Sequence, residues 1–219
     1  GIVYRIPLTN IVGNEGMGYY GFAFEVYQIL VILATNAVPV AVSKLTAARV
    51  ARHEYKNAQA IFKCSIIFAA VLSGTLALFT FVGARWISMV MFGGITDVAP
   101  ALRVLAPTVF VCAVMGVFRG YTQGLGNMAP TAFSQVVEQL FNAVVSVAAA
   151  AILISRGAAF GAAGGTLGTF MGAVSSLVFL YLVYSSYRPQ LARRMKKDPT
   201  QKLLENKTIY RMIGLTIIP

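Results

Sequence analysis

The sequence predicts an all-α protein that crosses a membrane several times. Of its 219 residues, 58% are hydrophobic and 11% are charged, whereas globular proteins average about half and a quarter. The apolar residues gather in five runs of about 20 residues, and each run is long enough to cross the roughly 30 Å hydrocarbon core as a helix. Because a helix satisfies its own backbone hydrogen bonds inside lipid, we expect these runs to be transmembrane helices.

The five predicted spans follow one another with short polar connections, at residues 22–43, 64–84, 99–121, 130–154 and 159–186. Pro100 and Pro130 stand at the starts of the third and fourth spans, where a helix needs no backbone N–H from its first residues. The opening GIVYRIPLTNIVG is typical of the end of an earlier span, and the closing IYRMIGLTIIP of the start of a later one. We therefore expect five complete and two partial spans, as part of a larger membrane protein.

Basic residues divide unevenly between the two sides of the predicted membrane domain. The first, third and fifth loops hold 13 Lys and Arg residues, whereas the second and fourth hold only Arg85 and Arg156. Because cytoplasmic loops retain positive charge, we expect the odd loops to face the cytoplasm. Residues 1–187 then form the transmembrane part, 188–208 a basic cytoplasmic linker that contacts anionic phospholipid, and 209–219 the start of the next span.

Polar side chains within the fourth span mark a candidate binding site. They recur every three or four residues, which places them on one helical face: Thr131, Gln135, Glu138, Asn142 and Ser146. Glu138 lies roughly 12 Å from the start of the helix, where a charge is costly unless it faces a cavity or a partner. Such a stripe either lines a cavity or forms a hydrogen-bonded seam between helices, and we favour the cavity.

Other residues within the spans offer weaker signals. Glu25 and Gln28 place polar groups in the first complete span, with Glu25 near its outer boundary. Arg119 stands near one end of the third span, where a long side chain either reaches the headgroups or joins the site. In the fifth span, glycines repeat every four residues and predict close packing against a neighbouring helix; they are Gly157, Gly161 and Gly165, and Gly164, Gly168 and Gly172.

The sequence does not indicate an enzyme, a metal site or a cofactor. The single histidine, His53, excludes an HExxH site, and Cys64 and Cys112 lie in separate apolar runs, which does not supply the ligands of a zinc site. The letters GLGNMA at residues 124–129 match a dinucleotide-binding loop but join two spans. We expect no metal, no cofactor and no nucleic-acid partner, and an integral-membrane transferase is a less favoured alternative.

Two segments resemble a known family: YRIPLTNIVGNEGMGYYGFAFEVYQILVILATNAVPVAVSKLTAARVARHEYKNA and, more specifically, LRVLAPTVFVCAVMGVFRGYTQGLGNMAPTAFSQVVEQLFNAVVSV. They are similar to the stage V sporulation protein B group of polysaccharide-biosynthesis membrane proteins. That group belongs to the multidrug, oligosaccharidyl-lipid and polysaccharide (MOP) exporter superfamily, together with lipid II flippases and multidrug and toxin extruders. The resemblance implies a bacterial plasma-membrane protein with two helical lobes around a central cavity. Residues 1–187 would be the amino-terminal lobe, running from the end of helix 1 through helix 6.

The resemblance also implies a function and a set of site residues. The substrate would be an undecaprenyl-linked cell-wall glycan precursor such as lipid II, moved by alternating access without covalent chemistry. In lipid II flippases, arginines of the first two helices meet the diphosphate; Arg5 matches the first, and QILVILATNAVPVAVSK lacks the second. We predict Arg5 at the diphosphate and Gln135, Glu138 and Asn142 at the sugar or a coupling ion (Na⁺ or H⁺). The remaining predicted site residues are Glu25, Gln28 and Arg119. The alternative is a cation-coupled multidrug exporter of the same superfamily.

Overall fold

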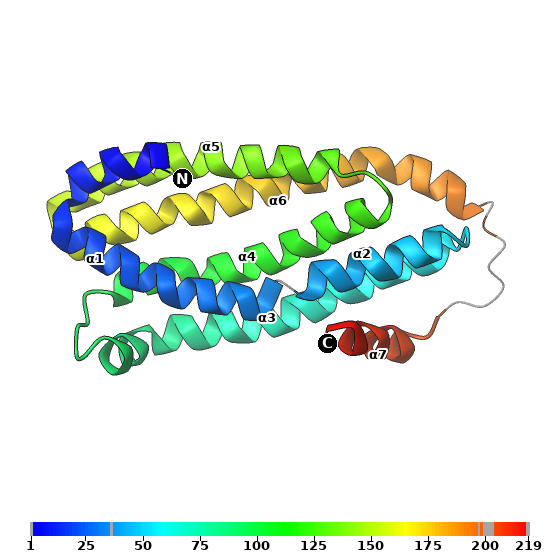
Figure 1. Cartoon of the computed structure of the whole chain (residues 1–219), viewed down its shortest axis with the longest axis horizontal. Coiled ribbons are helices and arrows are strands. Elements are labelled where there is room, and N and C mark those ends of the chain that lie inside the picture. The colour runs from blue at the N-terminus through cyan, green and yellow to red at the C-terminus, as the bar shows by residue number, and fades with distance from the viewer. Residues whose placement is uncertain (1, 36, 197, 199–203, 218–219) are drawn as a thin grey trace.

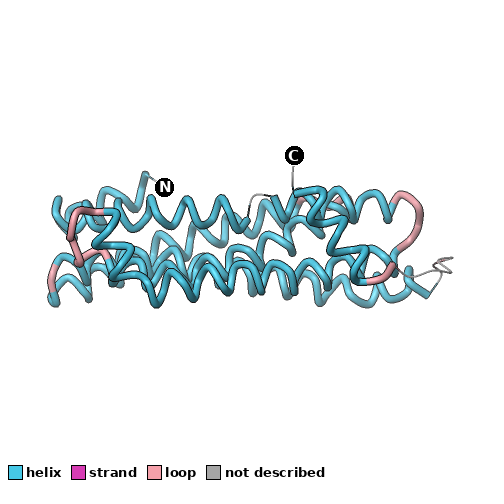
Figure 2. The backbone as a smooth tube through the Cα atoms, turned by 90° about the horizontal axis from the view of Figure 1, so that it is seen from below, coloured by secondary structure: helices cyan, strands magenta, loops and turns pink. Residues whose placement is uncertain are grey.

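The computed structural model describes residues 2–35, 37–196, 198 and 204–217. In this part of the chain the regular structure is entirely helical, which confirms the all-α prediction. The helices form an elongated bundle whose connections lie at its two ends (Figures 1 and 2). They are α1 Ile2–Thr35, α2 Ala37–Val50, α3 Tyr55–Met91, α4 Ala99–Gly124, α5 Ala129–Leu153, the 3₁₀ turn η1 Ile154–Arg156, α6 Ala158–Lys196 and α7 Asn206–Ile217.

Four helices of the described chain are long and apolar enough to cross a membrane: α3, α4, α5 with η1, and α6. They contain the second to fifth predicted spans, and α3 and α6 extend well beyond them because a helix continues its backbone hydrogen bonds in water. The first predicted span, residues 22–43, falls in α1 and α2, and residue 36 between them lies outside the described residues. Pro39, which lacks a backbone N–H, stands in the first turn of α2, where no such donor is needed.

The amino-terminal helix changes direction at Gly13, whose φ of 72° and ψ of 177° are not helical. Glycine adopts this backbone conformation without the steric cost that a Cβ would bring. The segment before the bend packs Leu8 and Val12 into a small buried cluster with Ala150 and Ala162, at one end of α5 and α6. This segment corresponds to the expected end of an earlier span, and the bend returns the chain along the bundle (Figure 1).

The central helix is α4, which carries fully buried residues such as Leu102 and Val109 and contacts α1, α2, α3 and α6. Gly120 and Gly124 allow α2 to pack directly on α4. A Cβ on Gly120 would overlap the backbone of Pro39, and one on Gly124 would lie 2.8 Å from the backbone oxygen of Ser43. The two helices therefore approach more closely than larger residues would permit.

The other close packing joins α5 to α6, and α6 lies between α4 and α5 (Figure 1). A Cβ on Gly168 would lie 2.6 Å from the backbone oxygen of Asn142, and one on Gly172 would lie 2.6 Å from that of Glu138. The predicted close packing is confirmed for Gly161, Gly164, Gly165, Gly168 and Gly172, whereas Gly157 precedes α6 and has open space where a Cβ would lie. The seam fixes the register of α5 against α6, and this register positions the polar residues of α5.

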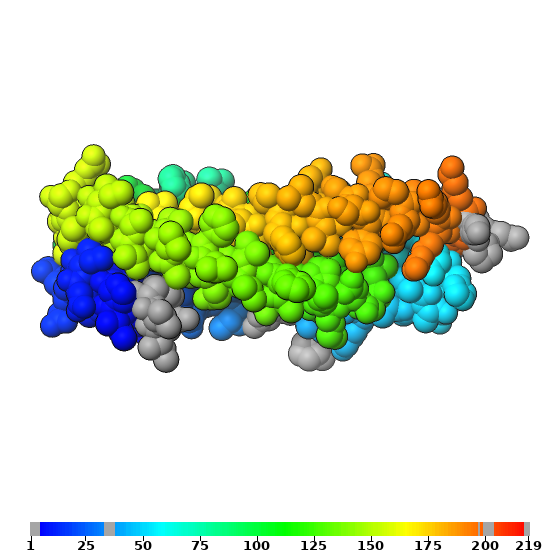
Figure 3. Space-filling view, turned by 90° about the horizontal axis from the view of Figure 1, so that it is seen from above, coloured from blue at the N-terminus to red at the C-terminus, as the bar shows by residue number. Residues whose placement is uncertain are grey.

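The outer surfaces of α3 and α5 carry large apolar side chains that the lobe itself leaves uncovered. Val82 on α3 and Ile152 on α5 are each 73% exposed. Figure 3 shows α5 and α6 side by side on one face, with the beginning of α1 at one end. In a bilayer such residues contact acyl chains, so their exposure agrees with membrane insertion.

The carboxy-terminal helix α7 lies beside α2 and α3 (Figure 1). Ile209 and Ile213 are fully buried against Ile61 and Cys64 of α3. The first part of the predicted linker, residues 188–196, continues α6, while residues 197 and 199–203 lie outside the described residues. The division at residues 187 and 208 stays a prediction, as does the assignment of 209–219 to the next span.

Candidate functional site

An ion pair between Arg119 of α4 and Glu138 of α5 forms the centre of the candidate site. The Arg119 Nη2 group donates to Glu138 Oε2 at 2.7 Å and to Ser176 Oγ of α6 at 3.1 Å, and its Nε donates to Ser134 Oγ of α5 at 3.0 Å. One guanidinium thus holds polar groups of three helices. The planar fork of arginine suits this role because its donors point in several fixed directions.

Local packing brings these four side chains together. The α5–α6 glycine seam sets Ser176 next to the turn of α5 that holds Ser134 and Glu138. The Ser134 hydroxyl donates to the backbone oxygen of Thr131 at 2.7 Å, which leaves its lone pairs directed to Arg119. Because α4 and α5 have few direct contacts, the long Arg119 side chain provides the polar connection between them.

The pair is partly buried, with side-chain exposures of 17% for Arg119 and 23% for Glu138. Both charges lose much of their hydration, and each offsets the other's cost. Both side chains still reach the surface of the lobe, so a ligand can approach them. We name Arg119, Ser134, Glu138 and Ser176 the Arg119 cluster.

The other predicted site residues lie at different places. Asn142 is buried in the α5–α6 seam, where its Oδ1 accepts a hydrogen bond from Ser146 Oγ at 2.9 Å. Gln135 is exposed on α5, whereas Glu25 and Gln28 are exposed on α1 and Arg5 is exposed on the first segment of α1. Within the described chain, no hydrogen bond or ion pair joins these exposed side chains to the Arg119 cluster. Their functional roles stay predictions.

The fourth-span stripe therefore divides into two parts. The single hydroxyl proton of Ser146 is shared between Asn142 Oδ1 and the backbone oxygen of Gly165, which lies 2.8 Å from Ser146 Oγ. Ser146 and Asn142 thus form a hydrogen-bonded seam between α5 and α6. Glu138 instead pairs with a cation and stays partly exposed. The hydrogen-bonded seam is therefore present at Asn142 and Ser146, whereas a cavity lined by Glu138 stays a prediction.

Ser134 and Ser176 are members of the cluster that sequence reasoning did not select. Ser134 stands one helical turn before Glu138, and that spacing places it on the same face. Ser176 is the second of two adjacent serines in the fifth predicted span, and its sequence position alone does not show that it faces α4. Only the packing of α6 between its neighbours brings it to Arg119.

A second polar cluster joins the α2–α3 turn to the segment before α7. Arg49 Nη1 and Asn57 Nδ2 each donate to Glu54 Oε2 at 3.0 Å, and Asn57 Oδ1 accepts from the backbone N–H of Leu204 at 3.0 Å. The hydrogen bond from Asn57, followed by that from Arg49, lowers the pKa of the Glu54 carboxyl. This cluster has a structural role because it holds a turn and a connection together.

The apolar helices and their exposed outer faces define the chain as a helical bundle of a multi-pass membrane protein. A MOP superfamily transporter from Pyrococcus furiosus, described as having a binding pocket of reverse polarity, has a similar fold. Its TM-score is 0.74 at 19% identity, and the match covers 99% of this chain and 47% of that one. The model of the family described as "Polysaccharide biosynthesis protein" matches residues 1–217. The chain belongs to this family.

Two relatives from Bacillus subtilis are similar over nearly the whole chain. Stage V sporulation protein B is 28% identical over 100% of this chain and 42% of its own length. The lipid II flippase MurJ is 26% identical over 98% of this chain and 41% of its own length. The chain thus spans about two fifths of the length of these relatives. The matches confirm the expected superfamily and a bacterial, multi-pass plasma-membrane protein.

Proposed function

We propose that the chain is the amino-terminal lobe of a translocase that moves an undecaprenyl-linked glycan precursor, such as lipid II, across the plasma membrane. The observation that supports this most is Arg119, a partly exposed guanidinium within the helical lobe. A lipid-linked precursor carries its negative charge on a diphosphate, and arginine binds phosphate oxygens through charge-assisted, often bidentate hydrogen bonds. The name of one relative, the lipid II flippase MurJ, agrees with this substrate class.

The Glu138 carboxylate pairs with the Arg119 guanidinium when no substrate is bound. Within the described chain, Arg119 donates through Nε and Nη2, which leaves Nη1 for an incoming phosphate oxygen. The diphosphate then competes with the Glu138 carboxylate for Arg119. Because this exchange alters the polar connection between α4 and α5, the substrate binds the two conformations of the lobe differently and shifts their populations.

The other predicted site residues have roles beside this exchange of the diphosphate for Glu138 at Arg119. Arg5 provides a second cationic group for the diphosphate, since it is exposed on the bent first segment of α1. Gln135 stands about one turn before Glu138 with its amide exposed, where it can contact the sugar. Asn142 supports α5 from the seam and contacts the sugar or ion only if the seam opens. Glu25 and Gln28 contribute polar contacts from α1.

The second candidate is a cation-coupled multidrug exporter, which the same ion pair favours in a different way. Protonation of the partly exposed Glu138, or Na⁺ binding to it, would release Arg119. Here the carboxylate is the essential group and Arg119 is its counterion. Replacing Glu138 by Gln keeps the shape but removes the titratable charge, so the two functions differ in which residue is indispensable.

The test uses the full-length gene product in a strain depleted of its lipid-precursor flippase. We expect Arg119→Ala and Arg5→Ala to abolish complementation at normal membrane levels, while Glu138→Gln gives a milder loss. Arg103→Ala is the matched control, because Arg103 is an exposed arginine of the same helix. Full complementation by both arginine variants, with loss of cationic-dye efflux in Glu138→Gln, would replace the proposal by the exporter.

A further inference from the structure

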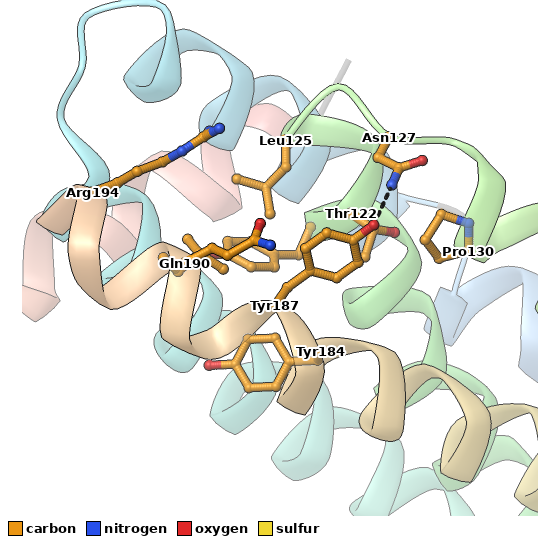
Figure 4. A pocket seen from close by; sticks show the side chains of 10 residues that line it. Thr122, Leu125, Asn127, Pro130, Tyr184, Tyr187, Gln190 and Arg194 are labelled. Carbon is orange, nitrogen blue, oxygen red and sulfur yellow. Dashed lines mark hydrogen bonds between the residues drawn. The ribbon is translucent and has the colours of Figure 1, made fainter.

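A cavity and a groove meet at the end of the lobe where α4, the α4–α5 turn and the last third of α6 come together. The cavity measures about 140 Å³ and its walls include Tyr121, Leu125 and Leu191. The groove measures about 560 Å³ and runs over the outside of α5 and α6. Tyr187 borders both spaces, together with Asn127, Pro130 and Gln190 (Figure 4).

The groove has the chemistry of a site for an acyl chain. Its walls include Phe133 of α5 and Phe179, Leu182 and Val183 of α6, and Phe133 and Leu182 are 63% and 58% exposed. The start of α5 and the last third of α6 lie side by side on this face (Figure 3). Because this face is apolar beside a transmembrane span, the groove opens to the hydrocarbon of the bilayer.

Polar donors gather where the groove meets the cavity. Asn127 is held in place because its Oδ1 accepts from the backbone N–H of Ala129 at 3.1 Å, at the start of α5. Its Nδ2 donates to the Tyr187 hydroxyl at 3.2 Å, which leaves the Tyr187 proton free to donate to a ligand. Gln190 and Arg194 of α6 also line the cavity at this polar rim (Figure 4), and the Arg194 guanidinium carbon lies 5.7 Å from the centroid of the Tyr55 ring.

The rim lies where α6 leaves the membrane. At 1.5 Å per residue the 39 residues of α6 extend about 58 Å, well beyond the roughly 30 Å hydrocarbon core. All charged side chains from Arg188 to Lys196 are basic: Arg188, Arg193, Arg194 and Lys196. The carboxylate of Asp198 accepts from the backbone N–H of Lys56 at 2.6 Å. A basic rim above an apolar groove matches an anionic headgroup above an acyl chain.

We propose that this cavity and groove bind one anionic glycerophospholipid from the surrounding leaflet. Arg194, Gln190 and the Tyr187 hydroxyl hold its phosphate, and one acyl chain lies along Phe133 and Leu182. The site is separate from the Arg119 cluster, because Ser176 and Tyr187 are eleven residues apart on α6 and therefore about 16 Å apart along its axis. The lipid ties the α4–α5 turn to α6 and does not depend on which substrate the lobe moves.

Native mass spectrometry of the full-length protein tests the proposal by titration with phosphatidylglycerol, phosphatidylcholine and phosphatidylethanolamine. We expect one phosphatidylglycerol to bind with higher affinity than either zwitterionic lipid. Arg194→Ala should weaken it roughly fivefold, the effect of one basic residue near an anionic surface. Arg193→Ala removes the same charge from an exposed neighbour that does not border the cavity, and should change the affinity less than twofold.

A second variant blocks the groove without changing charge. Val183→Trp should also weaken phosphatidylglycerol binding at least fivefold if the acyl chain lies in the groove. Equal effects of Arg193→Ala and Arg194→Ala would show a diffuse charge effect and overturn the proposal. Phosphatidylcholine binding as tight as that of phosphatidylglycerol, or unchanged phosphatidylglycerol binding in Val183→Trp, would also overturn the proposal. Displacement of phosphatidylglycerol by equimolar undecaprenyl phosphate would overturn it too, because it would place the substrate in this groove.

Discussion

A double-mutant cycle on Arg119 and Glu138 shows whether the ion pair couples α4 to α5. The atoms Nη2 and Oε2 are 2.7 Å apart, and both side chains are less than a quarter exposed. Two unit charges about 4 Å apart attract by about 4 kcal/mol at an effective dielectric constant of about 20. Removing one partner of a fully buried pair costs about 3–5 kcal/mol because the other charge is left alone.

Partial exposure places this pair at or below the lower end of that range. We therefore expect Arg119→Gln to lower the free energy of unfolding by about 3 kcal/mol and Glu138→Gln by about 2 kcal/mol. The double variant should lose about 3 kcal/mol, less than the sum, because neither charge is left unpaired. The resulting coupling energy is about 2 kcal/mol.

The assay is reversible unfolding of the full-length protein in mixed micelles with increasing SDS, followed by circular dichroism. A cycle that pairs Arg103→Gln with Glu138→Gln provides the control, since Arg103 is exposed on α4 and its effect should add to that of Glu138 within about 0.5 kcal/mol. A coupling energy below about 0.5 kcal/mol for Arg119 and Glu138 would refute the claim that the pair connects the helices.

Three further predictions concern topology, packing and pH. With both native cysteines removed, a cysteine at Lys56 should resist an impermeant thiol reagent in intact cells and one at Ser155 should react; the opposite labelling would reverse the orientation. Gly168→Ala should lower stability by about 1–3 kcal/mol through overpacking, whereas Gly18→Ala, with open space around the new Cβ, should not destabilise; thermal unfolding compares them. Because the pKa of Glu54 is lowered from its ordinary value of 4.5, the ionised carboxylate stabilises the α2–α3 turn at pH values above 4.5. This stabilisation is lost as the pH falls through the lowered pKa, so proteolysis of the turn should increase over that pH range. Glu54→Gln should make proteolysis of the turn less dependent on pH.

Hydropathy was sufficient to predict the class and four of the spans, because about 20 apolar residues fix a length that matches the bilayer. The α4–α2 contact had a visible signal: Gly116, Gly120 and Gly124 repeat every four residues, the spacing that predicted the α5–α6 contact.

The candidate site was only partly predictable. Helical periodicity placed Glu138 and Asn142 on one face of α5, but not the neighbour that each would meet. Asn142 contacts the glycine seam, whereas Glu138 meets Arg119, which is nineteen residues earlier in the chain. Such pairings depend on the order of helices in the bundle, and Ser176 joined the site for the same reason.

Translocation in liposomes tests the central claim most directly. The full-length protein is reconstituted in liposomes that carry a fluorescent lipid II analogue, and a membrane-impermeant reagent measures how much of the lipid has changed leaflet. We expect time-dependent translocation that Arg119→Ala abolishes and Arg103→Ala retains. Equal translocation by Arg119→Ala and the unchanged protein would contradict the account. So would a protein that does not translocate the lipid but exports a cationic dye in a manner that depends on Glu138.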